Sequence, residues 1–124
     1  MKLHADPLTA LNTVTAYGPG FIDINQTRHH GHLLVSPDRP VSAWDVGGFA
    51  SLRREDFEAV AELAPEVVLL GTGERQRFVA PSLVAPLARR GVGVECMTTA
   101  AACRTYNILM AEGRRVVAAF LQET

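Results

Sequence analysis

The sequence predicts an α/β fold: a single three-layer domain with a mixed central sheet, in which an N-terminal antiparallel meander is followed by βαβ units. Three observations support this prediction. Residues 11–46 are rich in turns, residues 52–121 alternate helical patterns with apolar strands, and the 124-residue chain shows no change of composition between domains. A chain of this length buries about two thirds of its unfolded surface, which suffices for one core. We therefore expect one domain over residues 1–124.

The turn signals of residues 11–46 divide this stretch into short strands. Glycine and proline interrupt it in the segments YGPG, NQTRHHG and SPDRP. The runs between these turns contain β-branched and aromatic residues, which is typical of strands joined by hairpins. We expect an antiparallel meander with strands in the segments TVTAY (13–17), FIDI (21–24), HLLV (32–35) and VSAWDV (41–46).

After Gly47-Gly48 the pattern changes to helices that alternate with strands lacking polar positions. Such strands are covered on both faces, as in parallel βαβ units. Pro81 near the start of one helix, and Gly91 and Gly113 just after the ends of two, mark helix boundaries. The predicted elements are helices at 52–63, 81–91 and 98–113 and strands at 67–71, 92–97 and 114–121.

Composition argues against several functional classes. With a net charge of -1 and a pI near 6.4, the chain lacks the positive field that supplies most of the affinity for nucleic acid. No stretch approaches the roughly 18 apolar residues of a membrane span. Residues 1–18 resemble neither a secretory signal nor a transit peptide. We expect a cytoplasmic protein that neither binds nucleic acid nor spans a membrane.

Two loops at the carboxyl ends of predicted strands are the strongest candidates for a ligand site. Gly71-Thr72-Gly73 follows the first strand of the βαβ half, and glycine there lets a ligand approach the backbone closely. Thr98 and Thr99 follow the second strand and suit the N-cap of the next helix. Ligands of open α/β sheets settle beyond such strand ends. If the two strands are neighbours, both loops face the same cleft.

Polar side chains near these loops suggest an anionic ligand or an acidic partner. Arg75 and Arg77 follow the glycine loop, and Arg104 and Asn107 lie on the helix after the second loop. Asn107 is about two helical turns after Thr99 and so lies on the same side of the helix. Arginine suits bidentate contact with carboxylate or phosphate. The predicted ligand-binding residues are Gly71, Thr72, Gly73, Arg75, Thr98, Thr99, Arg104 and Asn107.

Purely structural roles compete with each of these assignments. A glycine pair after a strand also makes an ordinary tight turn, and threonine at a helix start is a cap before it is a ligand contact. Most charged side chains are solvated, which would leave Arg75 and Arg77 in water. A buried amide needs partners, and a backbone group would satisfy Asn107. The sequence leaves these alternatives open.

Several sharper motifs are excluded by their spacing. A dinucleotide fingerprint needs glycine three residues after Gly73, where Gln76 stands, and the Gly-Lys-Ser/Thr run of a phosphate-binding loop is missing. A cysteine phosphatase would have arginine six residues after Cys96, where Ala102 stands. The RHHGH segment at 28–32 has no carboxylate or thiolate at a spacing that completes a metal set. We expect no cofactor and no metal.

The pattern as a whole resembles the Mth-domain family of unknown function. The similarity runs over nearly the whole chain and includes the segments VVLLGTGERQRF (67–78) and GVGVECMTTAAACRTYNILMAEGRRVVAAFL (91–121). The family includes a mitochondrial complex I assembly factor of the NADH dehydrogenase alpha subcomplex and an adipogenesis-associated protein. The resemblance implies a three-layer fold with a mixed central sheet, and no agreed enzymatic activity or cofactor. Further matching positions are Phe21, Ile22, Gly31, Leu33, Leu34, Val35 and Trp44.

One position departs from the pattern of the family. Members carry aspartate directly before the threonine that matches Thr99, where this chain has Thr98. If that acid is catalytic or binds a cation, its role is absent here. If it only caps the helix, threonine replaces it at small cost.

These observations lead to one main functional hypothesis and two alternatives. The main hypothesis is a non-enzymatic binding or assembly-factor-like domain, with a cleft for a small anionic ligand or a protein partner between residues 71–75 and the helix at 99–112. The first alternative is an enzyme that acts on a small anionic substrate in the same cleft through Cys96 or Glu74. The second is a homodimer in which an exposed edge of the meander pairs across a two-fold axis.

Overall fold

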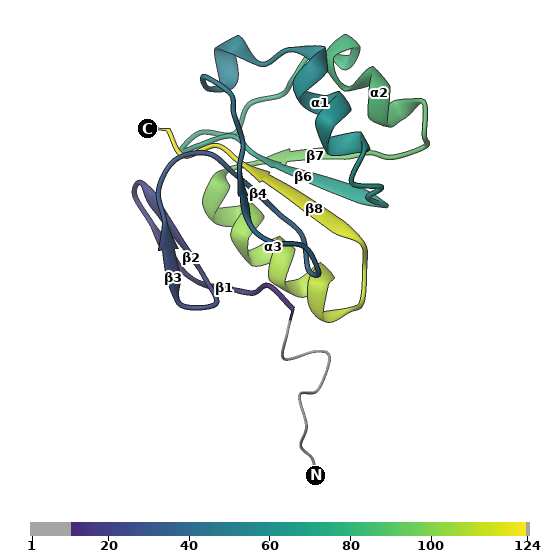
Figure 1. The fold of residues 1–124 in the computed structure, drawn as a ribbon. Helices are drawn as coiled ribbons and strands as arrows, with labels where there is room; N and C mark the ends of the chain where they lie inside the picture. The colour runs from purple at the N-terminus through teal and green to yellow at the C-terminus, as the bar shows by residue number, and fades with distance from the viewer. Residues whose placement is uncertain (1–10, 124) are drawn as a thin grey trace.

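The three-layer α/β fold is confirmed by the computed structural model, which describes residues 11–123 (Figure 1). The middle layer is a five-stranded mixed sheet made of β4 (Leu33–Val35), β5 (Ser42–Ala43), β6 (Val67–Gly71), β7 (Val94–Met97) and β8 (Val116–Phe120). Its strand order is β5-β4-β8-β6-β7. One face carries α1 (Arg54–Ala61) and α2 (Ala85–Ala88), and the other carries α3 (Thr99–Ala111) and a second sheet.

The second sheet is the main difference from the predicted meander. It contains β1 (Val14–Gly18), β2 (Phe21–Ile24) and β3 (Thr27–His29), all antiparallel. Asn25 and Gln26 both have positive φ, the geometry of a hairpin turn that matches the twist of its strands. The turn-rich half thus divides: its first three strands form their own sheet, and β4 and β5 join the central sheet.

The βαβ half folds as its pattern predicts. β6 pairs in parallel with β7 on one side and β8 on the other, while β4 runs antiparallel to β8. All residues of β6 and β8 are buried, because these strands lie inside the sheet with both faces covered. β7 is less buried because it forms an edge.

The helices begin and end where local chemistry requires, with one exception. At the start of α1, which follows the 3-10 turn η2 (Phe49–Ser51), Arg53 N–H donates to Asp56 Oδ2 at 2.8 Å, and Gly113, with φ +80°, follows the end of α3. The predicted helix at 81–91 is instead a 3-10 turn, η3 (Pro81–Val84), followed by the short α2. Pro86 has no N–H, so a helix continuing from residue 81 would lose a backbone hydrogen bond there.

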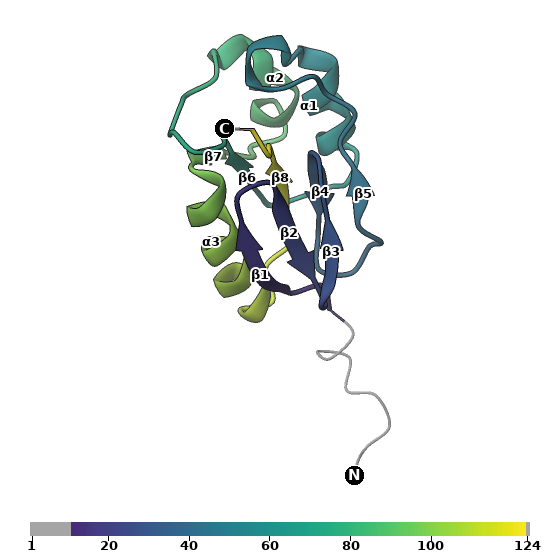
Figure 2. The same ribbon diagram turned by 90° about the vertical axis from the view of Figure 1, so that its left-hand side faces the viewer.

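Two apolar clusters fill the spaces between the three layers. Phe57, Leu70 and Leu87 belong to the cluster under α1 and α2, and Tyr106 and Phe120 to the cluster under α3 and the three-stranded sheet. In Figure 2, α3 and β1 lie side by side on this second face. The three-stranded sheet is therefore held mainly through α3 and the face of the central sheet.

Candidate functional site

The loops after β6 and β7 meet, because these strands are neighbours and parallel. Thr72 N–H donates to Met97 O at 2.8 Å, and Thr99 N–H donates to Gly73 O at 2.9 Å. Gly73 N–H in turn donates to the Thr99 hydroxyl at 2.8 Å. The two loops face one another as the sequence suggests, and these three N–H groups are already occupied by protein acceptors.

Gly71 and Gly73 allow the chain segments around them to pack closely. A Cβ on Gly71 would lie 3.0 Å from the Cα and from the hydroxyl of Thr99, and 3.3 Å from the ring of Phe120. Gly73 has φ +92°, and a Cβ there would lie 2.7 Å from the carbonyl oxygen of Glu123. The tight-turn interpretation therefore accounts for both glycines by contacts within the protein.

The two threonines at the start of α3 have different roles. The Thr98 side chain accepts a hydrogen bond from Ala101 N–H at 3.2 Å and caps the helix. The Thr99 hydroxyl donates to Leu121 O at 2.6 Å while it accepts from Gly73 N–H. Thr98 thus fills the capping role that an acid could also fill, and Thr99 joins the loop after β6 to the segment after β8.

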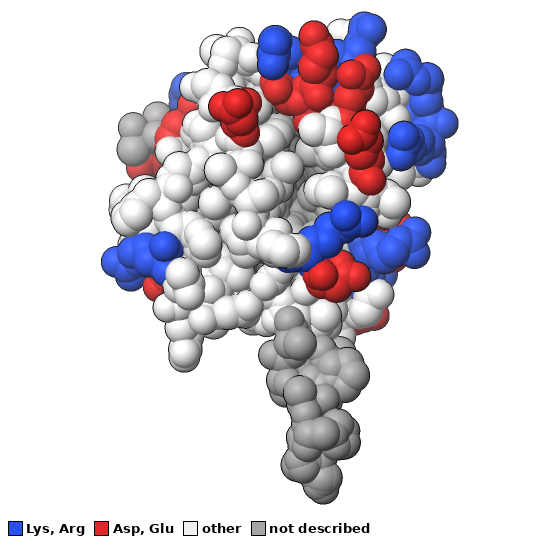
Figure 3. Space-filling model, viewed as in Figure 1, with Lys and Arg blue, Asp and Glu red and all other residues white. Residues whose placement is uncertain are grey.

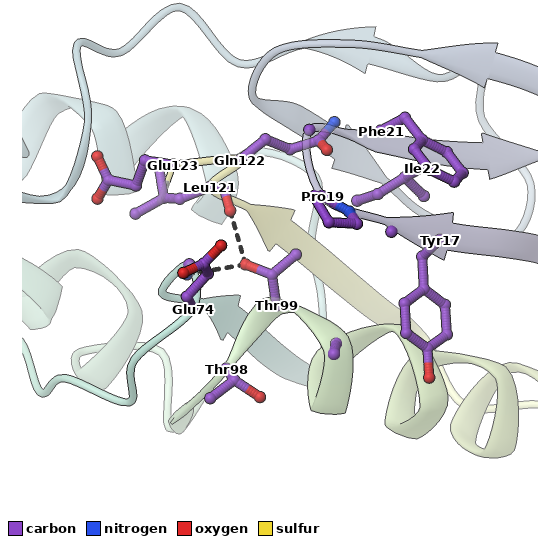
Figure 4. Close-up of a pocket in the computed structure, with 14 residues that line it drawn as sticks. Tyr17, Pro19, Phe21, Ile22, Glu74, Thr98, Thr99, Leu121, Gln122 and Glu123 are labelled. Atoms are coloured by element: carbon purple, nitrogen blue, oxygen red, sulfur yellow. Dashed lines mark hydrogen bonds between the residues drawn. The ribbon is translucent and has the colours of Figure 1, made fainter.

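A pocket of about 370 Å³ opens beside these loops (Figure 4). Four segments form its walls: residues 17–22 around the β1–β2 turn, residues 73–74, residues 98–100 and residues 121–123. Figure 4 shows Thr99 in the middle of the lining, with its hydrogen bonds to Gly73 and Leu121 drawn as dashed lines. The pocket lies where the ends of β6, β7 and β8 face the hairpin of the three-stranded sheet.

The pocket brings together only some of the predicted ligand-binding residues. Gly73, Thr98 and Thr99 line it, whereas Gly71 and Thr72 are buried beside it. The remaining predicted residues, Arg75, Arg104 and Asn107, lie outside its lining. The β1–β2 turn and residues 121–123, which the sequence reasoning did not include, supply much of the wall.

The charged residues in the lining are carboxylates. Glu74 and Glu123 line the pocket, and within the described part of the chain no lysine or arginine does so. Glu123 Oε1 lies 2.6 Å from Arg77, which approaches it from outside the lining. The interior of the pocket is therefore not the cationic site that an anion would need, although the positive end of the α3 dipole lies at one wall.

The arginines near the glycine loop separate into one that is exposed and one that turns inward. Arg75 is exposed, and its carbonyl oxygen lies 2.6 Å from the Thr72 hydroxyl. Arg77 donates to Thr72 O at 3.0 Å and to Glu123, and its guanidinium carbon lies 4.4 Å from the centroid of the Phe49 ring. Arg77 is therefore held by contacts within the protein, unlike the exposed Arg75.

The two predicted residues on α3 contact the three-stranded sheet. Arg104 donates to the Tyr17 hydroxyl at 2.8 Å, and because Tyr17 lines the pocket, this places Arg104 at the rim. The Asn107 amide oxygen accepts from Val14 N–H at 2.9 Å, and its nitrogen donates to Val14 O at 2.8 Å. Asn107 thus satisfies both backbone groups of one β1 residue, as the backbone alternative predicts.

The histidine segment links parts of the fold. His32 Nδ1 accepts from Gln122 N–H at 3.0 Å, and His30 Nδ1 lies 3.0 Å from Gly20 O. Among residues 11–123 no group of three or more His, Cys, Asp or Glu residues is placed to hold a metal ion. The RHHGH segment therefore connects the three-stranded sheet to the residues that follow β8.

The two cysteines lie away from the pocket lining. Cys103 is buried on α3, and burial raises the pKa of its thiol to about 12. Cys96 is half-buried on the edge strand β7, where its carbonyl oxygen accepts from the Gln76 amide at 3.0 Å. A thiol that stays protonated cannot act as a nucleophile near neutral pH, which leaves Cys96 as the one cysteine that the enzyme alternative could use.

Comparison with known proteins assigns the family. Residues 14–121 match the family model described as a protein of unknown function (DUF498/DUF598). The chain belongs to this family. A crystal structure of a Bordetella parapertussis protein is 53% identical, with a TM-score of 0.87, and covers 92% of this chain and 98% of that chain. A Bordetella pertussis structure described as a Mth938-like domain is 46% identical, with a TM-score of 0.82, over 98% of this chain and 92% of that one.

Curated relatives of the chain include assembly factors. NADH dehydrogenase [ubiquinone] 1 alpha subcomplex assembly factor 3 of Bos taurus is 35% identical over 104 residues, which are 82% of this chain and 55% of the relative. The Xenopus tropicalis protein of the same name is 33% identical over 97% of this chain and 65% of its own length. The chain thus spans between half and two thirds of the length of these curated relatives. The resemblance to the Mth-domain family is confirmed.

The surface and the helices add two findings. In the view of Figure 3, charged side chains gather over α1 and α2, where Arg53, Arg54, Glu55 and Glu58 are exposed. The middle of the surface below them is largely uncharged, with further charged side chains toward its left and right sides. Within residues 11–123, none of the helices combines the length and the apolar character that crossing a membrane requires.

Proposed function

We propose that this chain is a non-enzymatic, assembly-factor-like binding domain whose pocket receives part of a protein partner or a small anionic ligand. The observation that carries the proposal is the 370 Å³ pocket at the meeting of four chain segments. The names of the relatives support the assembly role, because those proteins are described as assembly factors. The cytoplasmic location expected from the sequence is part of this proposal.

The distribution of charge supports a specific orientation of the ligand. Glu74 in the pocket lining would repel an acidic group placed at the floor of the pocket, whereas the charge of Glu123 is paired with Arg77. Arg104 at the rim and the exposed Arg75 offer guanidinium groups to an acidic group outside the lining. The ligand would therefore place an uncharged part against the β1–β2 turn and an acidic part at the rim.

A quantitative capture experiment tests the proposal. The chain is immobilised and exposed to an extract of its source organism. The captured partner is identified, and its affinity for the chain is measured. Arg75→Ala with Arg104→Ala should weaken binding by about tenfold, since two charge-assisted contacts are lost. Arg39→Ala with Arg89→Ala is the matched control, because it removes two exposed arginines that lie outside this pocket. Equal affinities of the two double variants would reject the rim assignment.

The enzyme alternative rests on one observation, the position of Glu74 in the pocket lining. A carboxylate at this position could act as a general base toward a small substrate. A panel of anionic metabolites incubated with the protein tests for turnover, and Glu74→Gln and Cys96→Ala identify the group responsible. Turnover that Glu74→Gln abolishes would favour an enzyme, and panel-wide inactivity would disfavour it.

A second copy of the chain is the simplest protein partner. β5 lies at one edge of the central sheet, and both of its residues, Ser42 and Ala43, are exposed. An exposed edge strand can pair with another chain. Sedimentation analysis over a range of concentrations decides this point: a mass that stays monomeric at the highest concentration would rule out the homodimer.

A further inference from the structure

The residues that follow β8 form a pocket wall that is fixed firmly at one end. Leu121 N–H donates to Gly71 O at 2.9 Å, and Leu121 O accepts from the Thr99 hydroxyl at 2.6 Å. The Leu121 side chain is fully buried. In contrast, Gln122 and Glu123 are half-buried and lie beyond the last residue of the strand. Leu121 is therefore a firm anchor, and the two residues after it depend on other contacts.

Glu123 is held by a cradle of groups from two other segments. Its Oε1 accepts from the Arg77 guanidinium at 2.6 Å and from Phe49 N–H at 3.1 Å. Arg77 stacks over the Phe49 ring and also donates to Thr72 O, which fixes the direction of the guanidinium. In Figure 4 the Glu123 side chain extends away from Thr99, toward the side opposite the hairpin. The carboxylate thus has a dedicated binding place outside the pocket interior.

Two glycines leave the space that the cradle needs. A Cβ on Gly48, which has φ +131°, would lie 2.6 Å from Glu123 Oε2. A Cβ on Gly73, which has φ +92°, would lie 2.7 Å from Glu123 O. Both residues adopt backbone conformations that favour glycine and both touch the same residue. The chain is therefore shaped around Glu123 in this position.

Gln122 connects the same wall to the three-stranded sheet. Its N–H donates to His32 Nδ1 at 3.0 Å, and its amide nitrogen donates to Gly31 O at 2.7 Å and to His29 O at 3.3 Å. Residues 121–123 therefore bridge the hairpin side and the β6 side of the pocket. Moving residues 122–123 would widen the pocket between those two sides.

We propose that Arg77 and Glu123 form a latch that holds residues 122–123 as the movable end of a pocket wall anchored at Leu121, and that a partner entering the pocket displaces this end. This inference rests on the proposed function, because it concerns access to the same site. The latch is made of side chains that are 30% and 29% exposed, so water competes with the ion pair. Local opening in folded proteins occurs where few buried contacts hold a segment, which describes residues 122–123 and not Leu121.

Hydrogen exchange measured by NMR on the full chain without any partner tests the latch. Arg77→Gln and Glu123→Gln should each raise the exchange rates of the Gln122 and Phe49 amides by about tenfold, since each removes a charge-assisted contact. The amides of Val117, Ala118 and Ala119 in the buried strand β8 should keep their rates. The variant with both substitutions should show no larger change than either single one, because both remove the same interaction.

Arg28→Gln is the matched control. Arg28 also pairs with a carboxylate, Asp23 at 3.0 Å, and lies over a phenylalanine ring, Phe21 at 3.8 Å, but it belongs to the three-stranded sheet. This variant should leave the exchange of the Gln122 and Phe49 amides unchanged.

Two outcomes would overturn the latch. One is unchanged exchange at Gln122 and Phe49 in Arg77→Gln. The other is an equal rise along the whole of β8, which would mean that the ion pair stabilises the fold in general. Since this experiment contains no partner, its failure is distinct from failure of the capture experiment, which tests the proposed function alone.

Discussion

The two faces of the central sheet are held together in different ways. On the α1–α2 face the contacts are mainly apolar, as in the edge-on packing of Phe57 against Trp44, whose ring centroids are 6.0 Å apart. On the other face, α3 also makes hydrogen bonds to the N-terminal segment: the Tyr106 hydroxyl donates to Asn12 O at 2.8 Å, and Asn107 bonds to β1 twice. The α3 face is therefore held by hydrogen bonds, which have a preferred direction, as well as by apolar packing.

This difference shows how the pocket is positioned. Within residues 11–123 the three-stranded sheet shares no strand pairing with the central sheet, so no backbone ladder between these strands fixes its place. Side-chain hydrogen bonds from α3 fix the position of the three-stranded sheet instead, because a hydrogen bond weakens steeply when its donor and acceptor are displaced. Residues 17–22 of that sheet form a pocket wall, whereas α1 and α2 contribute no lining residue. The face that depends on directed contacts is thus the face that shapes the candidate site.

Truncation of a core side chain on the α1–α2 face should have the largest effect. Phe57 is fully buried, and Phe57→Ala should lower the free energy of unfolding by about 3–5 kcal/mol, the usual cost of such a cavity. Denaturant titration followed by circular dichroism measures the change. Phe78→Ala is the control: this side chain is 76% exposed, and its loss should cost no more than about 0.5 kcal/mol. Similar values for both variants would contradict the assignment of this core.

On the α3 face, loss of a polar side chain should disturb the structure mainly near the site of the change. Asn107→Ala removes both hydrogen bonds to Val14, which is buried, and should cost about 2–3 kcal/mol because two backbone groups lose their partner. NMR shift changes should concentrate in β1 and β2. Ile108→Ala, at the next and exposed position, should leave these shifts in place. Shift changes spread evenly over both sheets would show that Asn107 does not position β1.

Close packing at the strand ends gives a third, smaller effect. Gly71→Ala should cost about 1–3 kcal/mol, since its Cβ would press against Thr99 and Phe120. Gly93→Ala is a matched control because a Cβ there meets nothing within 4 Å and the residue has no positive φ. Thermal unfolding measures both variants, and Gly93→Ala should be neutral or slightly stabilising. Equal losses in both variants would show that the crowding at Gly71 is unimportant.

The parts of the fold that the sequence predicts are those that depend on local patterns. Apolar runs and helix caps locate β6, α3 and β8 to within about two residues. This works because the spacing of apolar residues along the sequence follows the geometry of the helix or strand that buries them. The choice of strand partners has no such local signal. β4 pairs with β8, far away in the sequence, while β1 to β3 turn away to form their own sheet. The pattern of the turn-rich half is compatible with either arrangement.

The candidate site follows the same division. The meeting of the two loops could be predicted, because parallel neighbouring strands end at the same edge of a sheet. Which arginine turns inward could not be predicted: Arg75 and Arg77 are two residues apart, and they differ in tertiary contacts, since Arg77 meets Glu123 and the Phe49 ring. The wall formed by residues 121–123 was missed for a related reason. It is made by tertiary contacts of a segment that has no motif of its own.

The smallest expected effect comes from a substitution on the α3 face that removes one hydrogen bond and keeps the packed ring. Tyr106→Phe keeps the buried ring and its edge-on contact with Phe120 but removes the hydrogen bond to Asn12 O, so we expect a loss of about 1 kcal/mol at neutral pH. Denaturant unfolding at pH 7 measures it. No loss would mean that this hydrogen bond does not help to hold the α3 face.

The pH dependence of the same variant provides a second measurement with a defined sign. Burial raises the pKa of the Tyr106 hydroxyl above its ordinary value of 10.0, so the folded protein keeps a neutral phenol where the unfolded chain ionises. The wild-type protein therefore has this contribution in full below pH 10 and loses it as the pH rises further. Tyr106→Phe has no phenol to ionise, so its deficit should shrink above that pH. A deficit that stays constant would show that Tyr106 ionises equally in both states, and the hydroxyl would then be in contact with water.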